Sequence, residues 1–222
     1  RGAFDKALEY AIDGIETDVQ LSRDEIAVLW HDRFLNKIGL DAKHIDDFDY
    51  HQLKTLIHPE SDGEGLMTLQ DFLATYSSRC RLLLEVKNRG WETAARHQLK
   101  IRQTLDLSGQ NLEHRIMVSS FNLASLEYAH QYRPGFPLIY NFETDQTLAD
   151  ARTILSTHAF LSGLCVPIQN LSLEMAELLR GHGKCIAVYT CNSDAEITQA
   201  LQLGVDILIS DLPQKALALR DR

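Results

Sequence analysis

Positive charge is scarce in this chain of 222 residues. Its 22 Lys and Arg stand against 31 Asp and Glu, which gives a net charge of −9, with a sequence pI near 5.4. Proteins that follow a nucleic-acid backbone rely on clustered Lys and Arg side chains. The sequence has no such cluster, so we expect no nucleic-acid partner. A phosphate group remains a reasonable ligand, because a single lysine or a metal ion can supply positive charge locally.

Long apolar runs are also lacking. None approaches the ~20 residues that a membrane-spanning helix needs, and no signal peptide is visible at the start of the sequence. Glycine and proline are few, at 12 and 5 residues, while hydrophobic residues make up 45% and charged residues 24% of the chain. This composition is typical of a globular domain rather than a disordered or fibrous chain. We therefore expect one domain over residues 1–222 with no transmembrane segment.

The four cysteines contain no C-x-x-C pair, and each stands in or beside an apolar run. A zinc site needs a tighter cluster of Cys and His than this sequence offers. Unpaired thiols are typical of a reducing compartment. We therefore predict buried free cysteines and a cytoplasmic location.

From residue 81 onward, short apolar runs alternate with segments of helical periodicity. The predicted strands cover residues 81–87, 116–119, 137–141, 160–166, 184–190 and 205–210. The predicted helices cover residues 93–105, 123–131, 147–157, 172–182, 194–203 and 213–219. Alternating strands and helices favour parallel pairing with right-handed crossovers. The sequence therefore predicts an α/β protein built as a (β/α)8 TIM barrel.

The region before residue 81 predicts further barrel elements. A strand at residues 15–21 is the seventh, and a return strand at residues 26–30 is expected as an excursion beyond the sheet. Thr68 begins a helix that runs to about residue 77, because Asp71 completes a capping box. A helix at residues 3–12 precedes the first predicted strand. The eighth barrel strand should precede that helix, so we expect it upstream of Arg1.

Charged side chains occur at two strand ends. Side chains at i and i+2 of a strand point to the same face, so Glu16 and Asp18 share one face, and Glu85 and Lys87 repeat the pattern. The chemistry of a TIM barrel lies at the carboxyl ends of its strands. Three carboxylates from Glu16, Asp18 and Glu85 could therefore converge on one hard divalent cation, Mg²⁺ or Ca²⁺. Lys87 would neutralise part of this charge or hold an anionic substrate.

Each of these residues also has a simpler interpretation. Carboxylates two residues apart are common in strands, and a Glu–Lys pair often just fills a barrel lumen. His31 follows the return strand, which could bring it near the carboxylates, yet a single histidine is often a surface residue. Asp211 could be a helix cap or a ligand. Other strand-end residues that could face the site are Ser119, Ser120, Phe121, Asn141, Glu143, Cys165, Tyr189, Thr190, Cys191 and Asn192.

Several of these motifs occur together in one known family. They are Gly14-Ile15-Glu16-Thr17-Asp18-Val19, His31-Asp32, Leu84-Glu85-Val86-Lys87, Ser120-Phe121, Val188-Tyr189-Thr190-Cys191-Asn192 and Ser210-Asp211-Leu212-Pro213. In this order they resemble the motifs of the glycerophosphodiester phosphodiesterase family over nearly the whole chain. One difference is Tyr189, since tryptophan is frequent there in the family. The family fold is a (β/α)8 barrel, which agrees with the predicted elements.

The resemblance implies a function and a set of site residues. Glu16, Asp18 and Glu85 would be the ligands of one divalent cation, and His31 one of two catalytic histidines. Lys87, Phe121 and Tyr189 would contact the substrate. The implied reaction is metal-dependent hydrolysis of a small glycerophosphodiester to sn-glycerol 3-phosphate and an alcohol. The alternatives are a phospholipase D-like lyase acting on sphingo- or lysophospholipids, and a barrel that binds phosphodiesters without turnover.

Two family features differ in this sequence. Members of the family begin with a strand ending in His-Arg-Gly, which carries the first catalytic histidine, and continue with a Glu-Asn-Thr loop. Arg1-Gly2 aligns either just after Glu-Asn-Thr or with the end of His-Arg-Gly. In both alignments we expect the partner histidine upstream of Arg1. Residues 36–39 also replace the Arg-Thr-Thr-type stretch that usually follows His-Asp.

Overall fold

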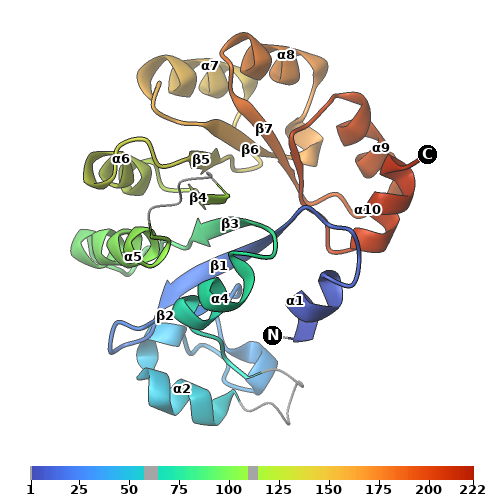
Figure 1. Cartoon of the computed structure of the whole chain (residues 1–222). Coiled ribbons are helices and arrows are strands. Elements are labelled where there is room, and N and C mark those ends of the chain that lie inside the picture. Colours follow the sequence, from blue (N-terminus) through green and yellow to red (C-terminus); the bar gives the residue numbers. More distant parts are fainter. Residues whose placement is uncertain (1, 58–64, 110–114) are drawn as a thin grey trace.

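The computed structural model describes residues 2–57, 65–109 and 115–222 and shows one curled sheet with helices around its outer side (Figure 1). The strand order is β2-β1-β3-β4-β5-β6-β7-β8, and every neighbouring pair is parallel except β1 and β2. The strands are β1 (Gly14–Leu21), β2 (Ala27–Leu29), β3 (Arg81–Val86), β4 (Ile116–Ser120), β5 (Leu138–Asn141), β6 (Gly163–Pro167), β7 (Cys185–Tyr189) and β8 (Ile207–Leu208).

A helix follows each parallel strand, as a TIM barrel requires. The α-helices are α1 (Gly2–Ala7), α2 (Tyr50–Leu56), α4 (Leu69–Tyr76), α5 (Ala94–Leu107), α6 (Leu123–Tyr132), α7 (Leu148–Thr157), α8 (Leu173–Gly181), α9 (Asp194–Gln202) and α10 (Pro213–Arg220). The six from α4 to α9 each begin after a Ser, Thr or Asn whose side chain accepts a backbone N–H of the first turn. Such caps satisfy donors that have no partner within the helix. The predicted barrel class is confirmed.

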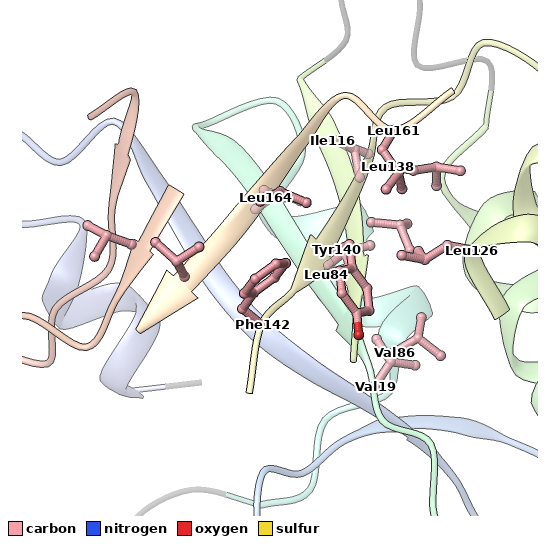
Figure 2. Close-up of a cluster of buried hydrophobic side chains, with 14 of the residues drawn as sticks. Val19, Leu84, Val86, Ile116, Leu126, Leu138, Tyr140, Phe142, Leu161 and Leu164 are labelled. Carbon is pink, nitrogen blue, oxygen red and sulfur yellow. The ribbon is translucent and has the colours of Figure 1, made fainter. Parts of the chain in front are cut away.

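The main core lies between the sheet and its helices. Figure 2 shows the outward side chains of Val19, Leu84 and Val86 in this layer, beside Leu126 of α6. The alternate side chains of the same strands point to the inner face, where Leu83, Ile139, Cys165 and Ala187 form a smaller buried cluster. The two-residue period of a strand therefore sends apolar residues outward and leaves the inner face of β1 and β3, toward their carboxyl ends, to charged ones.

The excursion after β1 carries a small core of its own. Val28, Leu35, Ile45, Leu53 and Ile57 are buried together there. The segment includes the short 3₁₀ helices η1 (Asn36–Ile38) and η2 (Ile45–Asp47), together with α2. Packing of this cluster fixes the polypeptide that leaves β2 and carries His31.

Some predicted boundaries were wrong. The return strand belongs to the sheet, because β1 is long enough for its last three residues to pair with β2 while residues 14–19 pair with β3. β6 begins at Gly163 rather than residue 160, because the Leu161 N–H donates to the His158 carbonyl and closes a turn. β8 spans only two residues, which pair with Ala187 and Val188 of β7. The first helix ends at Ala7 and continues as turns.

Gly163 provides a test of strand packing in the barrel. A Cβ added there would lie 2.3 Å from the carbonyl oxygen of Cys185 and 2.7 Å from its Cβ, so the backbones of β6 and β7 would have to separate. We expect Gly163→Ala to lower the free energy of unfolding by roughly 1–3 kcal/mol. Urea unfolding measures this change. Gly181→Ala is the matched control, because nothing lies within 4 Å of its added Cβ. Equal effects of the two substitutions would contradict the packing argument.

Candidate active site

Two neighbouring strands bring three carboxylates together. Asp18 of β1 stands directly opposite Glu85 of β3, and Glu16 lies two residues earlier on the same face as Asp18. Each of the three residues places one carboxylate oxygen within 4.8 Å of the other two. Asp18 and Glu85 are both buried. The i, i+2 spacing within β1 and the parallel register of β1 and β3 together produce this cluster. The sequence predicted that these three carboxylates would converge.

Lys87 supplies one positive charge to the cluster. Its Nζ lies 2.8 Å from Asp18 Oδ1 and 2.5 Å from Glu85 Oε1. Burial lowers the pKa of Lys87, but the two carboxylates outweigh it, and the net pKa is raised. The ammonium is therefore charged, and it balances only part of the charge of three carboxylates.

The pKa values of two of the carboxyl groups are raised in this crowded, buried site. Burial, followed by the charges of Asp18 and Glu85, raises the pKa of Glu16 well above its usual value. Burial also raises the pKa of Glu85, although Lys87 opposes this shift. Asp18 Oδ1 and Glu85 Oε1 have ion-pair contacts with Lys87 but no hydrogen bond of good geometry within the described residues. Clustered oxygen donors of this kind, short of positive charge, fit a hard divalent cation.

His31 stands at the rim, where β2 ends. Its Nδ1 lies 2.8 Å from Asp32 Oδ1, and the ring is 71% exposed. Lys37 Nζ lies 3.0 Å from the other carboxylate oxygen of Asp32. Burial would raise the pKa of Asp32, but hydrogen bonds from His31 and Lys37 lower it below its usual value. A carboxylate on Nδ1 leaves Nε2 of the same ring available for proton transfer.

The main chain that carries His31 is held by two other elements. Gln20 Nε2 on β1 donates to the carbonyls of Trp30 at 2.6 Å and Asp32 at 3.1 Å. Arg89, after β3, donates to the carbonyls of His31 at 3.1 Å and Asp32 at 3.2 Å. The rim of the site is therefore fixed through backbone oxygens, and the imidazole itself stays exposed.

The three carboxylates, Lys87 and His31 line one cavity of about 230 Å³. The structure brings to it every residue that the sequence singled out for the site: Glu16, Asp18, His31, Glu85, Lys87, Phe121 and Tyr189. The rings of Phe121 and Tyr189 meet edge to face, with centroids 6.0 Å apart. The Tyr189 hydroxyl donates to the Phe142 carbonyl, and burial raises its pKa. That hydroxyl is occupied, so the tyrosine contributes mainly an aromatic wall.

The cavity also includes residues to which the sequence gave no role. Ser119, Asn141 and Thr190 line it, and Asn141 Nδ2 lies 3.4 Å from Ser119 Oγ. Asn141 Oδ1 is buried and has no hydrogen-bond partner among the described residues. In the sequence, only the position of these three residues at strand ends indicated that they could face the site. Other polar residues share that position, and single amide or hydroxyl side chains form no sequence motif that would distinguish them.

Asp211 is held away from the carboxylate cluster. Its Oδ2 accepts a hydrogen bond of 2.8 Å from Asn192 Nδ2, and Leu212 rather than Asp211 caps α10. Neither role considered for Asp211 from the sequence is seen here. Its charge still reaches the site, where it contributes to the raised pKa of Glu16.

Comparison with known proteins identifies the family. Residues 2–215 match the Glycerophosphoryl diester phosphodiesterase family. The chain belongs to this family. It is therefore an enzyme of the phosphoric diester hydrolase class, as the motifs predicted.

Relatives cover almost the full length of the chain. A glycerophosphodiester phosphodiesterase of Bacillus altitudinis is 27% identical over 99% of this chain and 91% of its own. Two solved structures share the fold. A phosphodiesterase of Oleispira antarctica, in complex with the product sn-glycerol-3-phosphate, has a TM-score of 0.82 at 23% identity, covering 98% of this chain and 88% of its own. A glycerophosphodiester phosphodiesterase of Thermotoga maritima has a TM-score of 0.79 at 24% identity, covering 100% and 90%.

Two further sequence expectations can be compared with the structure. All four cysteines are free thiols, as predicted; Cys80, Cys165 and Cys191 are also buried, whereas Cys185 is only half-buried. Among the described helices, none combines the length and the apolar character needed to span a bilayer.

The charge imbalance leads to a prediction for Glu16. Because its pKa is higher in the folded chain than the ordinary 4.5, the folded state binds the proton more tightly, so stability falls as the pH rises above that value. We expect Glu16→Gln to raise the melting temperature in EDTA at pH 7 by a few degrees, since roughly 1 kcal/mol corresponds to about 2–4 °C in a domain of this size. It should also flatten the pH dependence.

Calorimetric melting between acidic and neutral pH measures both effects. Glu177→Gln makes the same chemical change at an exposed position on α8 and should leave the melting curve unaltered. A Glu16→Gln chain that melts at a lower temperature than the unsubstituted chain would show that the carboxylates do not repel one another as described.

Proposed function

We propose that this enzyme hydrolyses small glycerophosphodiesters to sn-glycerol 3-phosphate and an alcohol, with one divalent cation held by Glu16, Asp18 and Glu85. The observation that carries this proposal is the cluster of three carboxylates and Lys87 beside His31 in one cavity. Family membership supports the reaction class. The product complex of the Oleispira antarctica phosphodiesterase supports the choice of product.

The cation is the group that the three carboxylates imply. Mg²⁺ and Ca²⁺ both prefer oxygen ligands, and either would supply Lewis-acid stabilisation of charge on the phosphate. Once a cation takes up the carboxylates, the Lys87 ammonium becomes available to a substrate oxygen. Lys87 would then bind and orient the phosphate from one side of the cavity.

His31 is assigned proton transfer. With Nδ1 directed to Asp32 at 2.8 Å, the carboxylate orients the ring. Nε2 would then deprotonate the attacking hydroxyl or protonate the departing alcohol. Phe121 and Tyr189 offer aromatic edges and faces against which the carbon chain of glycerol would pack. The phosphate would then face the charged groups of the cavity, and the carbon chain would face the aromatic rings.

The free thiols bear on the lyase alternative. A disulfide between Cys185 and Cys191 would favour that alternative, and both residues are free thiols here. The hydrolase proposal is therefore preferred.

The proposal is tested by an assay for sn-glycerol 3-phosphate release from glycerophosphocholine. We expect turnover with Mg²⁺ or Ca²⁺, and loss of turnover in EDTA or with Glu85→Ala. His31→Ala should lower kcat by roughly 10²- to 10⁴-fold, the usual contribution of one general acid or base. His51→Ala is the control, because it removes an exposed histidine on α2 that does not line the cavity. This variant should keep the kcat of the unsubstituted chain.

Each outcome of the assay has a defined meaning. Full activity in EDTA would remove the cation from the proposal, and an unchanged rate with His31→Ala would remove that histidine. If the unsubstituted chain binds glycerophosphocholine in a calorimeter but releases no sn-glycerol 3-phosphate from it, the barrel binds phosphodiesters but does not turn them over.

A further inference from the structure

A second charged cluster lies behind the cavity, on the outer side of β3. Lys100 of α5 is completely buried, and its Nζ lies 2.8 and 2.9 Å from the two carboxylate oxygens of Glu92. The Glu92 side chain is 3% exposed. The third hydrogen bond of the ammonium goes to the backbone carbonyl of Lys87. Lys100 therefore uses all three of its N–H donors. One of them holds the main chain of Lys87, whose own ammonium contacts Asp18 and Glu85.

Glu92 fixes the turn that follows β3. It accepts a hydrogen bond of 2.9 Å from the Arg89 backbone N–H. Arg96 Nε at 3.4 Å and His97 Nε2 at 3.3 Å, both from α5, lie against the same carboxylate. The His97 ring also contacts the Arg89 carbonyl at 3.2 Å. The turn is thus tied to α5 through one buried carboxylate.

Arg89 carries the connection to the other side of the cavity. Its backbone is held by Glu92 and His97, and its guanidinium donates to the carbonyls of His31 and Asp32 at 3.1 and 3.2 Å. Lys87 and His31 are far apart in the sequence and leave different strands. The same buried ion cluster nevertheless holds the main chain of both.

Stability alone does not explain this arrangement. Two charges taken out of water carry a large desolvation cost, and replacing a buried ion pair with apolar residues of similar size is often neutral or stabilising. A helix position with no exposure would normally hold a Leu or Met. What the pair adds is direction, because an ammonium with three fixed partners holds one carbonyl in one place.

We propose that Glu92 and Lys100 are positioning residues that fix Lys87 through its carbonyl and His31 through Arg89. The inference rests on the proposed function, because it assigns Lys87 to the phosphate and His31 to proton transfer. The pair itself does not line the cavity and touches no reacting group. It acts by keeping two groups at a constant separation across the site.

The test replaces both charges at once. Glu92→Leu with Lys100→Met removes both members of the buried pair together, so neither remains as a single buried charge. Arg96 loses its contact with Glu92 but keeps its hydrogen bonds to the carbonyls of Leu21 and Ser22. We therefore expect a folded chain whose melting temperature falls less than that of Leu105→Ala. We expect kcat for the glycerophosphodiester to fall by roughly 10- to 100-fold, as for other residues that orient a site from behind. KM should rise by a smaller factor. Affinity for sn-glycerol 3-phosphate, measured by calorimetry with Mg²⁺ present, should fall by a similarly small factor, because Lys87 contacts the phosphate in both molecules.

Leu105→Ala is the matched control. Leu105 is buried on the same helix, more than one turn beyond Lys100, and belongs to the main core. This substitution should lower the melting temperature yet leave kcat unchanged below the unfolding transition. The double variant should therefore lose mainly kcat, and Leu105→Ala mainly stability, so the two effects can be told apart.

Hydrogen exchange supplies a readout that does not depend on turnover. In the double variant, the amides of residues 31–32 and 87–92 should exchange faster than in the unsubstituted chain and in Leu105→Ala. A double variant that keeps kcat within twofold, or keeps the exchange of these amides, would overturn the inference. If the unsubstituted chain is inactive, kcat cannot test the inference, and binding of sn-glycerol 3-phosphate together with hydrogen exchange then decides the positioning role.

Discussion

Repulsion among three carboxylates is the constraint on which the rest of the site depends. Glu16, Asp18 and Glu85 meet within 4.8 Å, and Lys87 lies among them as a counter-charge. Like charges at this distance in a poorly hydrated site interact strongly. Burial, followed by repulsion from Asp18 and Glu85, raises the pKa of Glu16. A bound cation would relieve this repulsion, so the feature that destabilises the fold is also the one that would favour positive charge in the cavity.

The surrounding elements hold the site in place through the main chain. Gln20 and Arg89 fix the carbonyls around His31, while Lys100 fixes the carbonyl of Lys87. These side chains bind backbone oxygens and so occupy neither the imidazole of His31 nor the ammonium of Lys87. They position the main chain of both residues without using the groups to which we assign a role. Helices pack the apolar outer face of the strands (Figure 2), which makes the sheet a rigid base for both.

Much of the fold could be predicted because each element has its own local signal. The strand period of two places Leu84 and Val86 in the core and Glu85 and Lys87 on the inner face, and Thr68 caps α4 as expected. The errors occur where pairing decides. Residues 205–210 have the apolar character of a full strand, yet β8 has only β7 beside it in the described sheet, and just two of its residues form ladder pairs. The return run joins the sheet because β1 extends past β3, a length that only the pairing reveals.

The sequence alone determined which residues belong together chemically. Spacing within a strand sets which side chains share a face, and that is a local property of the backbone. It therefore identified Glu16 with Asp18 and Glu85 with Lys87. Tertiary structure decided which other residues complete the site. Asn141, Ser119 and the pair Glu92–Lys100 are joined to it by contacts between distant segments, and no periodicity encodes such contacts. Their roles follow from the register of parallel strands and from burial, which exist only once the chain has folded.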